Sequence, residues 1–287
     1  MHEMTPALGF RATPRRTRRR VVARVIAMSV VALLIAAPAS AVVGGSPDTA
    51  NRYSNVGLIV VRLDGEWFGQ CSGTLVRDNV VLTAAHCVDV FSEEFPDPVP
   101  VDDLGVVFDP VPVPGGGSTQ YQVASVQVHP SWWDLPPGGW QLQAAWARPE
   151  DAALMWLKEP VADIEPAPIV GIGGLDGLAL TDETFTVVGY GITEFITGTV
   201  LSPMGEWLGS GRNFKHVSVI TKHGAIADRY LKITTSTCFG DSGGPLLYGD
   251  TVVAINTWTS SWRCSAPSYS YRLDTPLAQT FLNAWLD

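Results

Sequence analysis

The sequence predicts an all-β domain. From Val42 onward, short apolar runs alternate with turn signals, a pattern typical of antiparallel strands joined by tight turns. Glycine (28 residues) and proline (21 residues) are frequent among the 287 residues, and this composition disfavours a coiled coil or a helical bundle. Because 46% of the side chains are hydrophobic, the chain is expected to fold around a core rather than remain disordered.

Strands are predicted where runs of β-branched and aromatic residues lie between turn signals. The predicted strands cover residues 56–63, 80–83, 121–128, 185–188, 217–221, 245–248 and 251–256. Gly249 and Asp250 separate the last two runs and predict a hairpin turn. Within residues 121–128 the alternation of apolar and polar side chains changes phase, which predicts a β-bulge.

One helix is predicted at the end of the chain. Thr275 can cap it, and Pro276 suits its first position. The helix is expected to pack on the core through a stripe with four-residue spacing, formed by Leu277, Phe281 and Trp285. By contrast, segments 91–117 and 131–149 are rich in proline, glycine, acids or tryptophan and predict surface loops.

The first 41 residues predict a secretory signal peptide. Seven arginines lie in this stretch, an apolar run follows at residues 25–37, and Ala39, Ser40 and Ala41 form a small-x-small cleavage site. The thirteen residues of the apolar run are fewer than the ~20 needed to span a bilayer, so secretion is favoured over a membrane anchor. Residues 17–21 also resemble a twin-arginine export signal.

The charge of the remaining chain excludes one class of partner. Residues 42–287 hold 12 Lys and Arg against 27 Asp and Glu, a net charge of −15. A basic surface that follows a phosphate backbone is therefore not expected, and nucleic acid is excluded as a main partner.

Three separate segments carry residues suited to nucleophilic catalysis. In residues 238–245, Ser242 is flanked by glycines that allow a tight turn whose backbone amides can hold an oxyanion. A serine hydroxyl needs a base to remove its proton, and His86 in residues 83–87 offers one. A buried acid must orient that histidine, and Asp151 stands at the head of an apolar run.

These motifs, in the order His, Asp, Ser, resemble those of the chymotrypsin-like (trypsin-fold) serine proteases, and the resemblance covers nearly all of residues 42–287. It implies two six-stranded antiparallel barrels, about 42–165 and 166–287, with the active cleft between them. Residues 189–191 and Trp258 match further family features. The implied activity is that of a secreted endopeptidase that acts on proteins or peptides, with protein inhibitors as possible partners.

The resemblance also assigns roles. His86 matches the general base, Asp151 the orienting acid and Ser242 the nucleophile, and the amides of Gly240 and Ser242 would form the oxyanion hole. No cofactor is implied.

Among the three possible cysteine pairings, the family implies Cys71–Cys87 and Cys238–Cys264. The alternative is a zinc site, which is disfavoured because the spacings lack a Cys-x-x-Cys pair and an exported chain meets an oxidising compartment. No metal site is therefore expected.

The resemblance further implies an activating ion pair. Val42 begins a segment that resembles the mature amino terminus of the family, whose α-amine pairs with the acid before the nucleophile, here Asp241. Because the predicted signal cleavage falls directly before Val42, export itself is expected to produce the active amino terminus.

The specificity pocket is expected to be neutral. Ser236 falls at the pocket base, where relatives that cleave after Lys or Arg carry Asp, and Thr259 is expected to narrow the pocket. A neutral base cannot compensate a buried cation. Cleavage after small or medium uncharged residues is therefore expected, with large apolar residues as the second choice.

Several alternatives remain. A catalytically silent secreted binding protein on the same fold would usually lack one of the three catalytic residues, and all are present. Residues 240–244 satisfy the Gly-x-Ser-x-Gly pattern of esterases and lipases, but in that fold the acid follows the serine. Acidic residues near position 102 form a solvated loop or, less readily, a calcium site: these are Asp102, Asp103 and Asp109. Tryptophans before Asp151 line substrate subsites or cover a barrel edge: these are Trp132, Trp133, Trp140 and Trp146.

Overall fold

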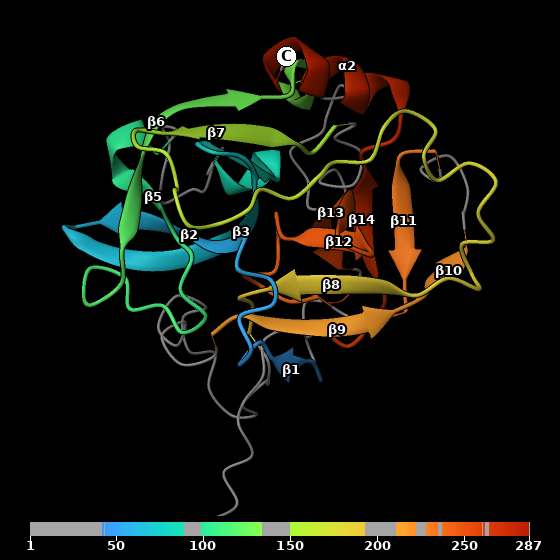
Figure 1. The fold of residues 1–287 in the computed structure, drawn as a ribbon, viewed down its shortest axis with the longest axis horizontal. Coiled ribbons are helices and arrows are strands. Elements are labelled where there is room, and N and C mark those ends of the chain that lie inside the picture. The colour runs from blue at the N-terminus through green and yellow to red at the C-terminus, as the bar shows by residue number, and fades with distance from the viewer. Residues whose placement is uncertain are drawn as a thin grey trace, which may run out of the picture. The chain divides into compact units, whose positions relative to one another are not determined.

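The computed structural model describes residues 42, 44–88, 99–133, 150–192, 211–221, 228–234, 237–259, 261 and 264–286 (Figure 1). The predicted signal peptide, residues 1–41, lies outside the described residues. No helix within the described ranges combines the length and apolarity needed to cross a membrane.

The first half of the protein is a closed antiparallel barrel (Figure 1). Its strands are β2 (Val56–Leu63), β3 (Glu66–Arg77), β4 (Val80–Thr83), β5 (Leu104–Val107), β6 (Gln120–Val128) and β7 (Ala153–Leu157). They follow one another around the barrel in the order β2-β3-β4-β7-β6-β5. Closure pairs every strand with two neighbours, so no edge of this barrel is left open.

The second half, together with β1 from the N-terminal segment, forms an eight-stranded antiparallel sheet, whose order is β1-β9-β8-β12-β13-β14-β11-β10. Its strands are β1 (Ser46–Pro47), β8 (Phe185–Gly189), β9 (Asn213–Val217), β10 (Val219–Thr221), β11 (Tyr230–Ile233), β12 (Pro245–Tyr248), β13 (Thr251–Thr259) and β14 (Ser268–Arg272). The expected fold class is confirmed. The second sheet differs from the expected six-stranded barrel because the described strands form an open row, which β1 extends by pairing with β9.

Several predicted strands have the expected bounds, and two details differ. The hairpin β12–β13 forms, and the bulge in β6 lies between Val123 and Ser125. The run predicted at residues 217–221 is two strands, because β9 pairs with β8 whereas β10 pairs with β11, and the chain changes neighbour at Ser218. Strand β5 lies in a segment predicted as a loop; it has only four residues, and its pairing with β2 and β6 makes it a strand.

The predicted helix is α2 (Pro276–Leu286), and Thr275 caps it by accepting a hydrogen bond from the N–H of Ala278 at 3.3 Å. The predicted stripe is wrong at two of its three positions. Phe281 is buried, but Leu277 is 54% exposed and Trp285 is 47% exposed. A helix advances 100° per residue, and the buried stripe follows Ala278, Phe281 and Leu282 instead.

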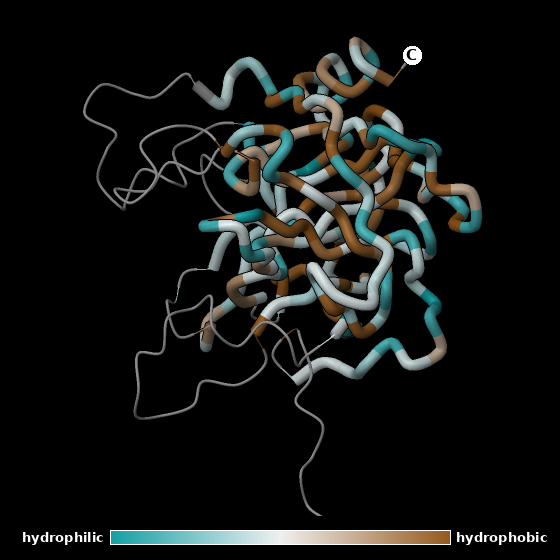
Figure 2. Tube along the Cα trace, turned by 90° about the vertical axis from the view of Figure 1, so that its left-hand side faces the viewer, coloured by the Kyte–Doolittle hydropathy of each residue, from teal (hydrophilic) through white to brown (hydrophobic). Residues whose placement is uncertain are grey.

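Along the Cα trace, hydrophobic residues (brown) gather toward the interior, whereas many hydrophilic residues (teal) lie at the periphery (Figure 2). One buried cluster draws on both halves: it extends from Val56 and Leu58 of the barrel to Val188, Tyr190 and other residues of the second sheet. The two halves therefore share a core at their junction.

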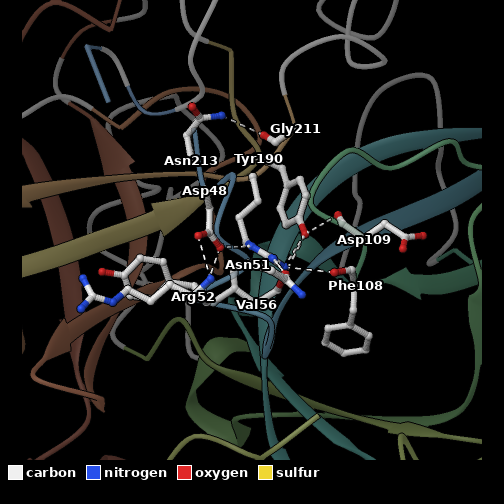
Figure 3. Close-up of polar contacts among 11 residues, drawn as sticks. Asp48, Asn51, Arg52, Val56, Phe108, Asp109, Tyr190, Gly211 and Asn213 are labelled. Atoms are coloured by element: carbon white, nitrogen blue, oxygen red, sulfur yellow. Dashed lines mark hydrogen bonds and ion pairs between the residues drawn. The ribbon is translucent and has the colours of Figure 1, made fainter. Parts of the chain in front are cut away.

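A fully buried arginine also joins the two halves, and Figure 3 labels several residues that it contacts, among them Asp48, Val56, Phe108 and Tyr190. Arg212, just before β9, pairs its Nε with Asp48 Oδ2 at 2.9 Å. Its Nη1 donates to the carbonyl oxygens of Val56 at 2.9 Å and Phe108 at 3.0 Å, which belong to the barrel half, and to the hydroxyl of Tyr190 at 3.2 Å. Because a buried guanidinium is stable only with its donors satisfied, this network fixes the N-terminal segment against both halves.

Candidate active site

The antiparallel pairing of β4 with β7 brings His86 and Asp151 together. Thr83, the last residue of β4, lies opposite Ala153, the first residue of β7. The chain leaves β4 through a short 3-10 helix, Ala85–Cys87, which carries His86. Asp151 lies just before the start of β7, at the same end of the barrel. His86 and Asp151, which are 65 positions apart in the sequence, are therefore in contact there.

Asp151 holds His86 at two points. Its Oδ2 lies 2.8 Å from the Nδ1 of His86, and its Oδ1 accepts a hydrogen bond from the backbone N–H of His86 at 3.1 Å. The Asp151 side chain is 8% exposed, whereas that of His86 is 33% exposed. A carboxylate can only accept, so the neutral imidazole carries its proton on Nδ1 and keeps its lone pair on Nε2.

Ser242 lies in a tight turn directly before β12. Gly240, with a φ of 99°, has a backbone conformation that favours glycine. The next glycine, Gly243, makes a close approach, since a Cβ there would clash with the Thr83 side chain and the Ser72 backbone. The turn therefore rests directly on the end of β4, two residues before Ala85 begins the helix of His86.

The hydroxyl of Ser242 donates a hydrogen bond of 3.4 Å to the carbonyl oxygen of Thr257 on β13. The register between β13 and β14 shifts between Asn256 and Trp258, so Thr257 occupies a β-bulge. Bulges redirect backbone groups at the edges of active sites, and this one turns a carbonyl toward Ser242.

Ser72 joins the two halves beside Ser242, and the sequence motifs did not identify it. Its hydroxyl donates to the carbonyl of Gly240 at 2.7 Å and accepts from the N–H of Tyr190 at 3.0 Å. Its N–H donates to the carbonyl of Ser242 at 2.7 Å, and its own carbonyl accepts from the Thr83 hydroxyl at 2.9 Å. The only sequence signal was its position directly after Cys71.

The N–H groups of Gly240 and Ser242 are the two that the family resemblance assigns to the oxyanion hole. Neither donates a hydrogen bond to another residue within the described part of the chain. The intervening N–H of Asp241 donates back to the carbonyl of Cys238 at 3.0 Å, which closes the turn. Two amides on one turn can stabilise a developing oxyanion.

Asp241 is fully buried, and this burial raises the pKa of its carboxyl group to about 7. The N–H groups of Cys238 and Gly191 each donate a hydrogen bond of 2.9 Å to the Asp241 carboxylate, and these two hydrogen bonds lower its pKa. No cation among the described residues forms an ion pair with it. Val42, which the family resemblance leads us to expect as the partner of Asp241, is also buried, in a cluster with Phe185.

The two residues expected to form the specificity pocket, Ser236 and Thr259, are described only in part. Thr259 ends β13, where its hydroxyl donates to the carbonyl of Ala266 at 3.3 Å. Ser236 lies outside the described residues. Trp258 stacks on Tyr269 of β14 with ring centroids 3.9 Å apart, so a flat aromatic surface lies beside the Ser242 turn.

Both expected disulfides are confirmed, Cys71–Cys87 and Cys238–Cys264. The first connects the helix of His86 to β3, and the second holds the segment before Ser242. Within the described ranges, the only group of potential metal ligands is Cys71, His86 and Cys87, and the disulfide consumes both thiols of that group.

The acidic loop carries ion pairs. Asp102 lies 2.9 Å from the ammonium of Lys158, and Asp103 lies 2.6 Å from the guanidinium of Arg62. Both ion pairs lie at the surface, where the Asp102 side chain is 80% exposed. Among the loop tryptophans, Trp132 is 3% exposed, which favours a covering role; the side chains of Trp133, Trp140 and Trp146 lie outside the described residues.

The chain belongs to the trypsin family, since the sequence model of that family matches residues 42–285. Membership supports a serine-protease-like function. Over 213 residues the chain is 26% identical to a trypsin of Saccharopolyspora erythraea, covering 73% of this chain and 82% of that protein. It is 27% identical over 237 residues to the dog chymotrypsin-like elastase family member 1, covering 78% and 83% of the two chains.

Solved structures agree on the fold. Mouse neuropsin, a serine protease, superposes with a TM-score of 0.60 at 17% identity and covers 86% of this chain and 100% of its own. A mutant of human heparin binding protein matches with the same TM-score and identity, covering 85% of this chain and 96% of its own. At this identity the likeness concerns the fold alone.

The Ser72 contacts generate a prediction. Ser72→Ala removes the hydroxyl that serves Gly240 and Tyr190 and leaves a buried carbonyl and a buried N–H unsatisfied, so the free energy of unfolding is expected to fall by about 1–3 kcal/mol. Urea unfolding measures this. Ser125→Ala, at an exposed position on β6 of the same barrel, is the matched control and is expected to change little. Equal stability of the two variants would contradict the role of Ser72.

Proposed function

We propose that the protein is a serine endopeptidase that hydrolyses peptide bonds through an acyl-enzyme intermediate. His86 takes the proton of Ser242 as its oxygen attacks the peptide carbonyl, and Asp151 stabilises the imidazolium that forms. The amides of Gly240 and Ser242 bind the oxyanion of the tetrahedral intermediate. His86 then protonates the leaving amine, and water releases the acyl group by the reverse sequence.

One observation supports this proposal above the others: the buried Asp151 holds both Nδ1 and the backbone N–H of an otherwise accessible His86. That arrangement orients an imidazole and selects the tautomer that a general base requires. The mechanism requires the Ser242 hydroxyl, which donates to the Thr257 carbonyl at 3.4 Å, to donate to Nε2 of His86 instead. Catalytic hydrogen bonds are often completed only when substrate binds.

The proposed enzyme is exported, and cleavage after Ala41 gives its active amino terminus. The α-amine of Val42 would then pair with Asp241 and hold Gly240 and Ser242 in their oxyanion-binding conformation. The Val42 backbone favours this proposal, because its φ of 59° is strained for a β-branched residue. The two disulfides also support export, because disulfides persist in oxidising compartments outside the cytosol.

The preference proposed for the residue before the scissile bond is small or medium and uncharged. Its basis is the neutral Ser236 at the pocket base and the Thr259 side chain on the wall, both assigned by the family resemblance. A pocket without an acid leaves a bound Lys or Arg uncompensated.

A fluorophosphonate probe tests the nucleophile. The secreted protein is expected to be labelled and to hydrolyse peptide amides, whereas Ser242→Ala should lose labelling and at least ~10³-fold in kcat/KM. Ser125→Ala serves as the control for general effects of serine removal. Equal labelling of wild type and Ser242→Ala would refute the assignment.

A substrate series tests the pocket. Peptide anilides that differ only in the residue before the scissile bond, Ala, Val, Leu, Phe or Arg, should rank with Ala and Val highest in kcat/KM and Arg lowest. A single methylene in an apolar pocket changes this ratio by ~10–200-fold, which sets the resolution of the test. A preference for Arg would contradict the neutral pocket.

The pH dependence of stability tests the activating pair. In a chain that keeps residues before Val42, the folded pKa of Asp241 is raised from 3.8 to about 7, so the folded state binds the proton more tightly than the unfolded state. Its stability contribution is complete below pH 4 and should be lost, by a few kcal/mol, as the pH rises through about 7.

A chain that begins at Val42 is the matched control. Its α-ammonium would stabilise the Asp241 carboxylate, so the decrease in the unfolding free energy between about pH 4 and pH 8 should disappear. Urea unfolding of both chains across this range makes the comparison, and identical pH profiles would exclude the pair.

A further inference from the structure

Glu150 is a buried acid without a part in the proposed mechanism. It directly precedes Asp151 and is 0% exposed, so two consecutive acids are buried at the entrance to β7. Burial of a second carboxylate beside the first costs free energy unless specific partners compensate it. The groups that surround the Glu150 carboxylate therefore indicate whether Glu150 affects the candidate active site.

The partners of Glu150 come from the second sheet. Tyr271 on β14 donates its hydroxyl hydrogen to Oε2. Oε1 has no hydrogen bond within the described part of the chain and lies 3.9 Å from Nη1 of Arg229, just before β11. Tyr230 packs on Tyr271 across β11 and β14, with ring centroids 5.8 Å apart. The carboxylate of Glu150, on the segment that enters the barrel, is thus held by the opposite half of the molecule.

The carboxylates of Asp151 and Glu150 both affect the buried phenol of Tyr230. Burial raises the pKa of Tyr230, and the charges of Asp151 and Glu150 raise it further, so its phenol lies in the field of both carboxylates. Burial also raises the pKa of Glu150, while the Tyr271 hydrogen bond and the Arg229 charge oppose this rise. Arg229 is the facing cation among the described residues, and at 34% exposure its charge is partly screened by solvent.

We propose that Glu150 is a positioning residue that acts through Asp151: it places a second negative charge behind the Asp151–His86 hydrogen bond and keeps the imidazole of His86 basic. Negative charge in a protein interior favours the protonated imidazole. One such charge beyond direct contact shifts an imidazole pKa on the order of half a unit to one unit. The effect of the Glu150 charge on catalysis rests on the proposed function, whereas its effect on the pKa of His86 does not.

The test measures the His86 pKa directly. In the Ser242→Ala form of the secreted protein, NMR titration of the imidazole should give a pKa lower by on the order of half a unit to one unit when Glu150→Gln is added. Glu150→Gln keeps an oxygen for the Tyr271 hydroxyl and removes the charge. Glu159→Gln, which removes an exposed acid just beyond the other end of β7, is the matched control and should leave the pKa unchanged.

The catalytic consequence is read from the same substitution in the protein with Ser242 intact. The acid limb of the kcat/KM profile should move to lower pH by the shift that NMR reports. A folded Glu150→Gln variant with the wild-type His86 pKa would overturn the proposal. If the protein lacks peptidase activity but the NMR shift occurs, the coupling stands and the proposed function fails.

A reciprocal measurement covers the case in which Glu150→Gln does not fold. Linkage requires that His86 stabilise the Glu150 carboxylate by the same amount. The Glu150 pKa, followed by the ¹³C shift of its labelled carboxyl carbon, should therefore be higher in His86→Ala than in the parent protein. Equal Glu150 pKa values in the two proteins would overturn the proposal.

Discussion

The arrangement of the site depends on one buried contact between the two sheets, made by Ser72. Through its hydroxyl and N–H, this residue connects β3 to the turn of Gly240 and Ser242 and to Tyr190 at the end of β8. The barrel supplies His86 and Asp151, whereas the second sheet supplies Ser242. These three side chains can cooperate only if the two sheets keep a fixed position relative to each other. Buried hydrogen bonds between the sheets hold that position, because any displacement would leave buried polar groups without partners.

Buried charges reinforce this junction, each in a different way. Arg212 and Asp48 form a satisfied ion pair that fixes the N-terminal segment. Glu150 is held from the second sheet by Tyr271 and Arg229. Asp241 has hydrogen bonds but no cation among the described residues. This difference gives Asp241 a regulatory character in the proposed mechanism, since a cation produced by cleavage would complete a site that is otherwise assembled.

The sequence predicted local structure well where a few neighbouring residues determine it. The Gly249–Asp250 hairpin, the bulge in β6 and the Thr275 cap all arise from adjacent residues, and all are observed. Prediction failed where burial depends on distant segments. Strand β5 exists because β2 and β6 flank it, and Leu277 of α2 is exposed because the helix meets the core along a different stripe.

By itself, the sequence determined the chemistry that is present: an all-β chain with a His, Asp and Ser motif in that order and four cysteines placed for two disulfides. The contact between His86 and Asp151, the hydrogen bonds between Ser72 and the Ser242 turn, and the burial of Glu150 against Tyr271 were decided only in the tertiary structure. The physical reason is that hydrogen bonds and desolvation depend on distances in space, and the pairing of β4 with β7 and the packing of the two sheets set those distances between residues far apart along the chain.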